Sequence, residues 1–87
     1  MSWRATSRVA VQRVSGELVL LDLTDGTFFV SKGLGPVVWE RVIEGRVSVE
    51  AVANEIADRY GRDPASVAVD VQAFLEDLRG RGFVDRG

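Results

Sequence analysis

The sequence predicts an α+β fold in which a three-stranded antiparallel sheet is followed by three helices. Two observations support this prediction. In the first third of the chain, apolar and polar residues alternate with the period of two that is typical of strands. In the rest of the chain, apolar residues recur every three or four positions, which is the spacing of a helix buried on one face. A length of 87 residues allows one domain over 1–87.

Strands are expected over 8–14, 18–23 and 27–31. Between the last two, Thr24-Asp25-Gly26 is the strongest turn signal, because glycine readily takes the positive φ that a tight hairpin needs. The polar segment 1–7 is predicted to be a loose N-terminus. In a three-stranded meander the third strand is an edge, so its free backbone N–H and C=O groups can pair with an added peptide strand.

Each of the three helices has a recognisable start or end. The first is expected from Leu34 to Gly45, with a proline in its first turn. Ser48 is a good N-cap for the second helix. Asp63 followed by Pro64 is a strong start for the third helix. Glycines that follow the second and third helices are expected to end them.

Composition excludes several classes of function. The formal net charge of −2 disfavours a protein that binds nucleic-acid phosphates. With no cysteine and no histidine in the sequence, there is no disulfide, no usual zinc ligand and no imidazole base for a nucleophile. No apolar stretch reaches the length of a membrane span and no signal peptide opens the chain. A cytoplasmic binding module is therefore expected, rather than an enzyme, with no cofactor, metal or membrane partner.

Two glycine-containing segments have a faint likeness to ligand loops. Residues 33–36 lack the full spacing of a phosphate-binding loop, and residues 22–26 lack the length and closing glutamate of a calcium loop. Both are interpreted as turns. Phe28 and Phe29 are neighbours on a strand and must point to opposite faces, so one of them is expected in the core and the other outside it.

Four segments of the chain carry a family signature: 20–29 (LLDLTDGTFF), 35–40 (GPVVWE), 47–52 (VSVEAV) and 70–84 (DVQAFLEDLRGRGFV). In this order and spacing they resemble the PqqD-like family, and the resemblance covers about residues 8–84. One departure is at the end of the third strand, where the family usually has Leu-Asn and this chain has Ser31-Lys32.

The resemblance implies a winged-helix-like fold and a role in peptide recognition. Such domains bind the leader segment of a ribosomally synthesised precursor peptide, which adds to the third strand and lies against the third helix. A free-standing copy of this length is most similar to the lasso-peptide version. Its implied partners are the precursor leader, a leader peptidase of the cysteine-protease type and, downstream, a macrocyclase. The other branch of the family implies a peptide chaperone of the PQQ pathway.

The resemblance also implies which residues bind the peptide. Strand residues 27–31 would supply backbone pairing, and a pocket between strand and helix would have charged residues at its rim. On the other sheet face, Phe28 and Val30 would contact the peptidase or pack with Trp3. Asp70 is expected to be partly desolvated and Asp77 more exposed. The expected peptide-binding residues are Thr27, Phe28, Phe29, Val30, Ser31, Val67, Asp70, Val71, Phe74, Asp77 and Arg81.

A nucleic-acid-binding winged helix is the alternative from a different class. Its usual order of elements begins with a helix, whereas this chain begins with its sheet. The third helix also mixes three acidic residues with two arginines near its C-terminal end, which makes a poor surface for phosphates.

Overall fold

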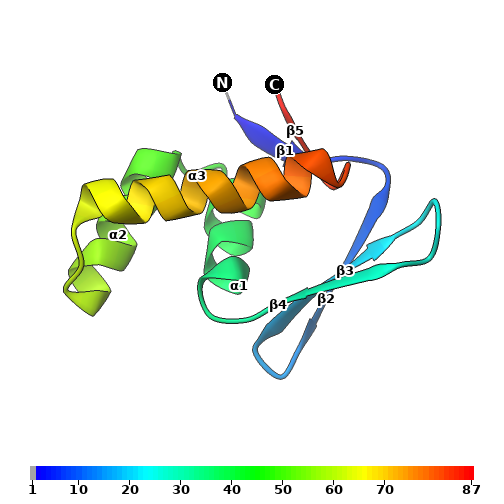
Figure 1. The fold of residues 1–87 in the computed structure, drawn as a ribbon, viewed down its shortest axis with the longest axis horizontal. Helices are drawn as coiled ribbons and strands as arrows, with labels where there is room; N and C mark the ends of the chain where they lie inside the picture. The colour runs from blue at the N-terminus through cyan, green and yellow to red at the C-terminus, as the bar shows by residue number, and fades with distance from the viewer. Residues whose placement is uncertain (1) are drawn as a thin grey trace.

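The computed structural model describes residues 2–87. Figure 1 shows α3 as a long helix, with the three-stranded sheet and α1 along one side of it and the pair β1 and β5 close to both termini. In chain order the elements are β1 (Trp3–Ala5), β2 (Val9–Val14), β3 (Glu17–Asp22), β4 (Phe28–Ser31), α1 (Leu34–Val38), η1 (Trp39–Glu44), α2 (Val49–Tyr60), α3 (Pro64–Gly80) and β5 (Val84–Arg86).

The three expected strands form one antiparallel sheet with the order β2-β3-β4. Each strand pairs with its neighbour in sequence, and β3 lies in the centre, so β2 and β4 are both open edges. The turn before β4 places Gly26 at a φ of 76°, the left-handed value expected from the sequence. The prediction of a meander whose third strand is an edge is confirmed.

The prediction of a loose N-terminus over 1–7 is wrong for the segment that forms β1. β1 pairs antiparallel with β5, and Trp3 stands opposite Arg86. Trp3 is only 5% exposed and packs into the core with β5 and η1, not on the outer face of the sheet with Phe28 and Val30. Burial of this large aromatic ring stabilises the pairing of the two chain ends.

The expected helices are present, and their predicted caps are confirmed. The side chain of Ser48 accepts a hydrogen bond from the Ala51 N–H at 3.1 Å, and Asp63 accepts one from the Ser66 N–H at 3.2 Å. The first helix changes character midway, because α1 continues into η1, which is π-helical. The N–H of Gly45 then bonds the carbonyl five residues earlier, a widening that periodicity alone does not predict.

A single core lies between the inner face of the three-stranded sheet and the helices. Leu18 and Leu20 of β3 are fully buried against helix residues that include Val38, Val71 and Leu75. On the same inner face Asp22 is buried, and both of its carboxylate oxygens have partners. One pairs with Arg8 at 3.0 Å, and the other accepts a hydrogen bond from the backbone N–H of Thr24. None of the helices over residues 2–87 is long and apolar enough to cross a membrane.

Candidate functional site

The open edge of β4 presents the backbone of two residues. The Asp22 N–H donates to the Thr27 carbonyl at 2.8 Å, so Thr27 directs its backbone groups toward β3. In an antiparallel pair this direction alternates along the strand. Phe29 therefore also faces β3, whereas the N–H and C=O groups of Phe28 and Val30 face away from it. These outward groups are the ones that an added strand can use.

A groove lies beside this edge, where β4, α1 and α3 meet. It contains a cavity of about 230 Å³. Its floor is apolar and includes the buried side chains of Val38 and Val71. Four of the expected site residues line it, so the strand end and the third helix do come together as the resemblance implies. The lining residues are Ser31, Lys32, Leu34, Gly35, Val38, Asp70, Val71 and Phe74.

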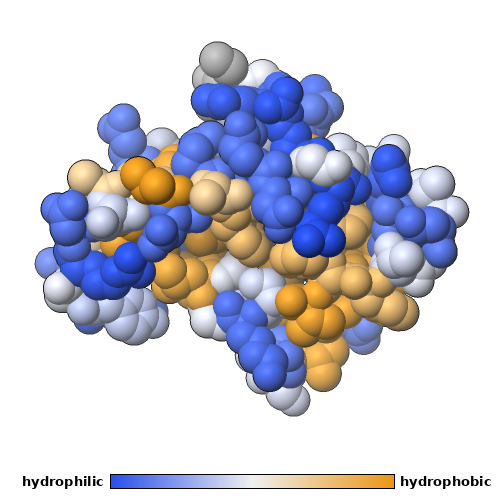
Figure 2. All heavy atoms as spheres, viewed as in Figure 1, coloured by the Kyte–Doolittle hydropathy of each residue, from blue (hydrophilic) through white to orange (hydrophobic). Residues whose placement is uncertain are grey.

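An aromatic cluster joins β4 to α3 next to the cavity. The ring of Phe29 lies 6.4 Å from that of Phe74 and 6.3 Å from that of Phe83, in the tilted arrangement that aromatic pairs favour. The guanidinium of Arg81 lies 4.6 Å from the centre of the Phe29 ring, which is a cation–π contact. Figure 2 shows hydrophobic side chains exposed along the boundary between α3 and the sheet. An extended peptide placed there would meet an apolar wall.

Gly35 allows the close approach of β4 and α1 at the bottom of the groove. A Cβ atom at this position would lie 2.7 Å from the Cβ of Ser31 and 3.3 Å from Cζ of Phe74. The first distance is too short for any rotamer of Ser31 to relieve, because Cβ does not move with χ1. The cavity therefore depends on a glycine here for steric reasons, and not for a special φ.

The acidic residues of α3 differ from the expectation. Asp70 and Asp77 have almost equally exposed side chains, at 54% and 53%, so the prediction that Asp70 is partly desolvated is wrong. Asp70 pairs with Arg62 at 2.7 Å, and Asp77 pairs with Arg81 at 3.3 Å. Both carboxylates are thus solvated members of ion pairs, and such a pair contributes about 1 kcal/mol or less. Asp70 lines the cavity, whereas Asp77 does not.

The structure also shows where the expected pocket residue Val67 and the two neighbouring phenylalanines of β4 lie. Val67 is completely buried and packs in the core, so it does not line the groove cavity. Phe28 and Val30 are 68% and 53% exposed, and they lie on the sheet face opposite the core. Phe29 is the member of the aromatic pair that packs inward, in agreement with the alternation of the strand.

Sequence reasoning missed four residues that line the cavity. Three of them belong to the start of the first helix, where periodicity indicated only a core-facing stripe. A turn of helix that abuts the end of a strand forms part of a groove only once the two are placed in space. The signal that could have found them was the glycine in the GPVVWE segment, because a glycine in a helix is costly without a packing reason. The missed residues are Lys32, Leu34, Gly35 and Val38.

The fold and the groove define a small α+β domain with an open strand edge beside an apolar groove, and the comparisons with known proteins give its family. The family described as "Coenzyme PQQ synthesis protein D (PqqD)" matches residues 17–84. The chain therefore belongs to the PqqD family, and the resemblance in the sequence is confirmed.

Two solved structures share this fold. One is TbiB1 in complex with the TbiA(β) leader peptide, with a TM-score of 0.85, 25% identity and coverage of 97% of this chain and 96% of that chain. The other is lasso peptide synthetase B1 complexed with the leader peptide, with a TM-score of 0.90, 20% identity and coverage of 99% and 100%. The predicted α+β, PqqD-like fold class is confirmed.

A curated relative is the PqqA binding protein of Rhodopseudomonas palustris (strain BisB5). It is 36% identical over 44 residues, which is 51% of this chain and 43% of that protein. The alignment thus spans less than half the length of this relative.

Proposed function

We propose that this chain binds the leader segment of a ribosomally synthesised precursor peptide, and that the leader adds as a strand to the open edge of β4. The observation that carries the proposal is the backbone of Phe28 and Val30, which faces outward directly beside the groove with its aromatic wall. The family and the two leader-bound structural neighbours support it.

The groove has room for alternate side chains of such a strand. Side chains two positions apart on an extended peptide lie about 7 Å apart on the same face. One leader side chain would enter the cavity between Ser31, Gly35 and Phe74. The next would lie against the Phe29 ring and the stem of Arg81. Apolar side chains at these alternate positions are the ones that the lining favours.

The domain would do no chemistry in this role. It would hold the leader and present the cleavage point to a cysteine-protease-type leader peptidase, with a macrocyclase acting downstream. A tethered precursor has a high effective concentration at a peptidase that binds the cut point weakly. The exposed side chains of Phe28 and Val30 would contact the peptidase, because they project from the same strand that holds the leader, on its opposite face.

A chaperone role in the PQQ pathway is the second candidate. It is favoured by the relative named as a PqqA binding protein. The lasso-peptide version is favoured by the leader-bound structures, which match nearly the whole chain. Both roles use the same groove, so the identity of the peptide separates them.

Isothermal titration calorimetry of the full chain with three synthetic peptides tests the proposal. The peptides are the TbiA(β) leader, PqqA and a scrambled TbiA(β) leader. We expect saturable binding of the TbiA(β) leader, weaker binding of PqqA and no heat from the scrambled control. Tighter binding of PqqA would assign the chain to the PQQ pathway. Equal binding of the scrambled peptide, or binding of neither leader, would overturn leader recognition.

A cleavage assay tests delivery separately, with a precursor that carries the TbiA(β) leader and a cysteine-protease-type leader peptidase that cleaves it, at low micromolar concentrations. The chain is expected to lower the apparent KM for precursor while leaving kcat nearly unchanged. Replacement of Phe28 by Ser should remove this stimulation without weakening leader binding. A cleavage rate that is the same with and without the chain would contradict delivery and leave leader binding standing.

A further inference from the structure

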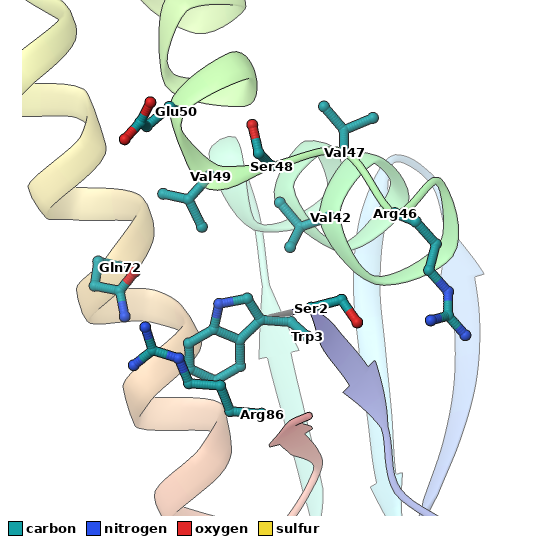
Figure 3. A pocket seen from close by; sticks show the side chains of 10 residues that line it. All are labelled: Ser2, Trp3, Val42, Arg46, Val47, Ser48, Val49, Glu50, Gln72 and Arg86. Carbon is teal, nitrogen blue, oxygen red and sulfur yellow. The ribbon is translucent and has the colours of Figure 1, made fainter.

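A second cavity lies elsewhere on the molecule and shares no lining residue with the groove. It has a volume of about 300 Å³ and is bounded by β1, β5, α3 and the segment that joins η1 to α2. Figure 3 shows the indole of Trp3 lying across it, with Val42 and Val49 close by. Nothing in the proposed leader-binding role uses this cavity.

The apolar side chains that line the cavity are packed against the core. Trp3 is 5% exposed and Val42 is 2% exposed, so both are held in place by surrounding atoms. Val49, which is half-buried, begins α2 at the edge of the cavity. A small apolar group bound here would be in contact with an aromatic ring and two branched side chains.

The polar groups around the indole are mostly hydrogen-bond donors. Figure 3 shows the indole nitrogen of Trp3 on the side of the ring that faces Val49 and Gln72, and an indole N–H can only donate. The guanidinium of Arg86 lies over the same ring at 5.3 Å. In Figure 3 the side-chain ends of Gln72 and Arg86 point toward one another beside the indole. Gln72 can add a further N–H to this group.

The charge of Arg86 has no partner within the described chain. The ion pairs formed among residues 2–87 do not include it. The cation–π contact holds the guanidinium beside the Trp3 ring, and a planar guanidinium matches a carboxylate in geometry. Glu50 is the acidic residue that lines the cavity, and Figure 3 shows its carboxylate at the far end, directed away from Arg86.

We propose that this cavity binds a carboxylate carried on an apolar body. Arg86, Gln72 and the indole N–H of Trp3 would donate to the carboxylate, and Val42 and Val49 would contact the apolar part. A peptide chain end and an acidic side chain share this chemistry. The site is independent of the leader groove, so its failure would leave the proposed function untouched.

Nuclear magnetic resonance of the full 15N-labelled chain tests this site with N-acetylleucine and its neutral amide, N-acetylleucinamide. The acid is expected to shift the Trp3 indole N–H in a saturable way, whereas the amide is not. The second tryptophan, Trp39, is 1% exposed and does not line the cavity, so its indole signal serves as an internal control. N-acetylleucylaspartate N-methylamide keeps the apolar leucine and carries a side-chain carboxylate in place of the chain-end one. Whichever of the two acids binds more tightly shows which kind of carboxylate the site takes.

Two substitutions in the cavity and one outside it test which side chains hold the acid. Arg86→Gln is expected to weaken binding of the acid at least tenfold, and Gln72→Ala is expected to weaken it by a smaller factor. Arg59→Gln is the matched control, because this arginine is also without an ion-pair partner in residues 2–87 but lines a different cavity. An unchanged Trp39 signal shows that a variant is folded. Equal shifts with acid and amide, or full binding by a folded Arg86→Gln chain, would overturn the proposal.

Discussion

Gly35 and Ser31 form the tightest point of the groove, and they can be tested as a pair. Gly35→Ala is expected to destabilise the chain and to weaken leader binding at least tenfold, because the new methyl group collides with Ser31 at 2.7 Å between Cβ atoms. The double variant with Ser31→Gly removes that atom and should recover most of both losses, because the remaining contact with Phe74 at 3.3 Å is only slightly tight. Thermal unfolding and calorimetry measure the two effects. A double variant no better than Gly35→Ala alone would contradict this account.

Phe74 contributes to the groove more than to the core. It is half-buried, and its main aromatic contact is with Phe29 across the groove wall. Phe74→Ala is expected to weaken leader binding by about 2 kcal/mol or more. Its cost in the free energy of unfolding should stay below the roughly 3–5 kcal/mol of a fully buried phenylalanine. Val69→Ala is the control, because that side chain is 68% exposed on the same helix. A folded Phe74→Ala chain with unchanged affinity would place the binding surface elsewhere.

At the level of elements, the two edges of the sheet differ in what lies beside them. β4 borders the groove, whereas β2 does not line it. Val30→Pro removes an N–H that faces away from β3, so it should abolish leader binding while the sheet keeps its internal hydrogen bonds. Calorimetry and circular dichroism would measure the two outcomes.

The same substitution on β2 provides a matched control. Leu23 donates to the Arg8 carbonyl at 2.7 Å, so by alternation the N–H of Val11 also faces outward. Val11→Pro should therefore resemble Val30→Pro in its effect on the fold and should retain leader binding. If Val11→Pro loses binding and Val30→Pro keeps it, then the leader uses the other edge.

Two carboxyl groups should make the stability of the fold sensitive to acid: Asp25 in the turn before β4 and Glu55 in α2. Hydrogen bonds from the Thr27 hydroxyl and backbone N–H lower the pKa of Asp25. Pairing with Arg41 likewise lowers the pKa of Glu55, which joins α2 to η1. A carboxyl whose pKa is lower in the folded state stabilises the fold above its unfolded pKa, and this contribution is lost as the pH falls through the folded pKa. The melting temperature should therefore decline below about pH 4.

Asp25→Asn combined with Glu55→Gln tests the origin of this decline. The variant should be less stable than the native chain at pH 7 and should lose less stability on acidification. Thermal melts between pH 7 and pH 3 measure the difference. Parallel pH profiles for the variant and the native chain would show that other groups control the acid response.

At the scale of the whole molecule, the sequence predicted most of the architecture because its signals are local. Caps such as Ser48 and Asp63 act within one turn, and the alternation of Phe28 and Phe29 follows from the geometry of a single strand. The pairing of β1 with β5 joins opposite ends of the chain through strands of three residues each. Such short strands have no measurable period, so the burial of Trp3 could not be predicted.

The sequence predicted which elements form the site, but not which side chains of α3 are buried and which are exposed there. The open strand edge follows from the meander, and the family resemblance added the facing helix. Val67 lies in the core, whereas Phe74 lines the groove. This difference depends on how α3 is rotated about its own axis against the sheet, and the spacing of apolar residues in α3 does not determine that rotation. The exposure of Asp70 depends on the same rotation and on a partner, Arg62, that lies before the helix.

Strand addition requires the leader peptide to pair with the outward backbone of β4. Hydrogen exchange of individual amides, measured by nuclear magnetic resonance with and without saturating TbiA(β) leader, tests it most directly. The amides of Phe28 and Val30 are expected to become strongly protected when the leader binds, while the amide of Val11 on the opposite edge exchanges as before. Unchanged exchange at Phe28 and Val30 in the bound state would contradict strand addition to β4.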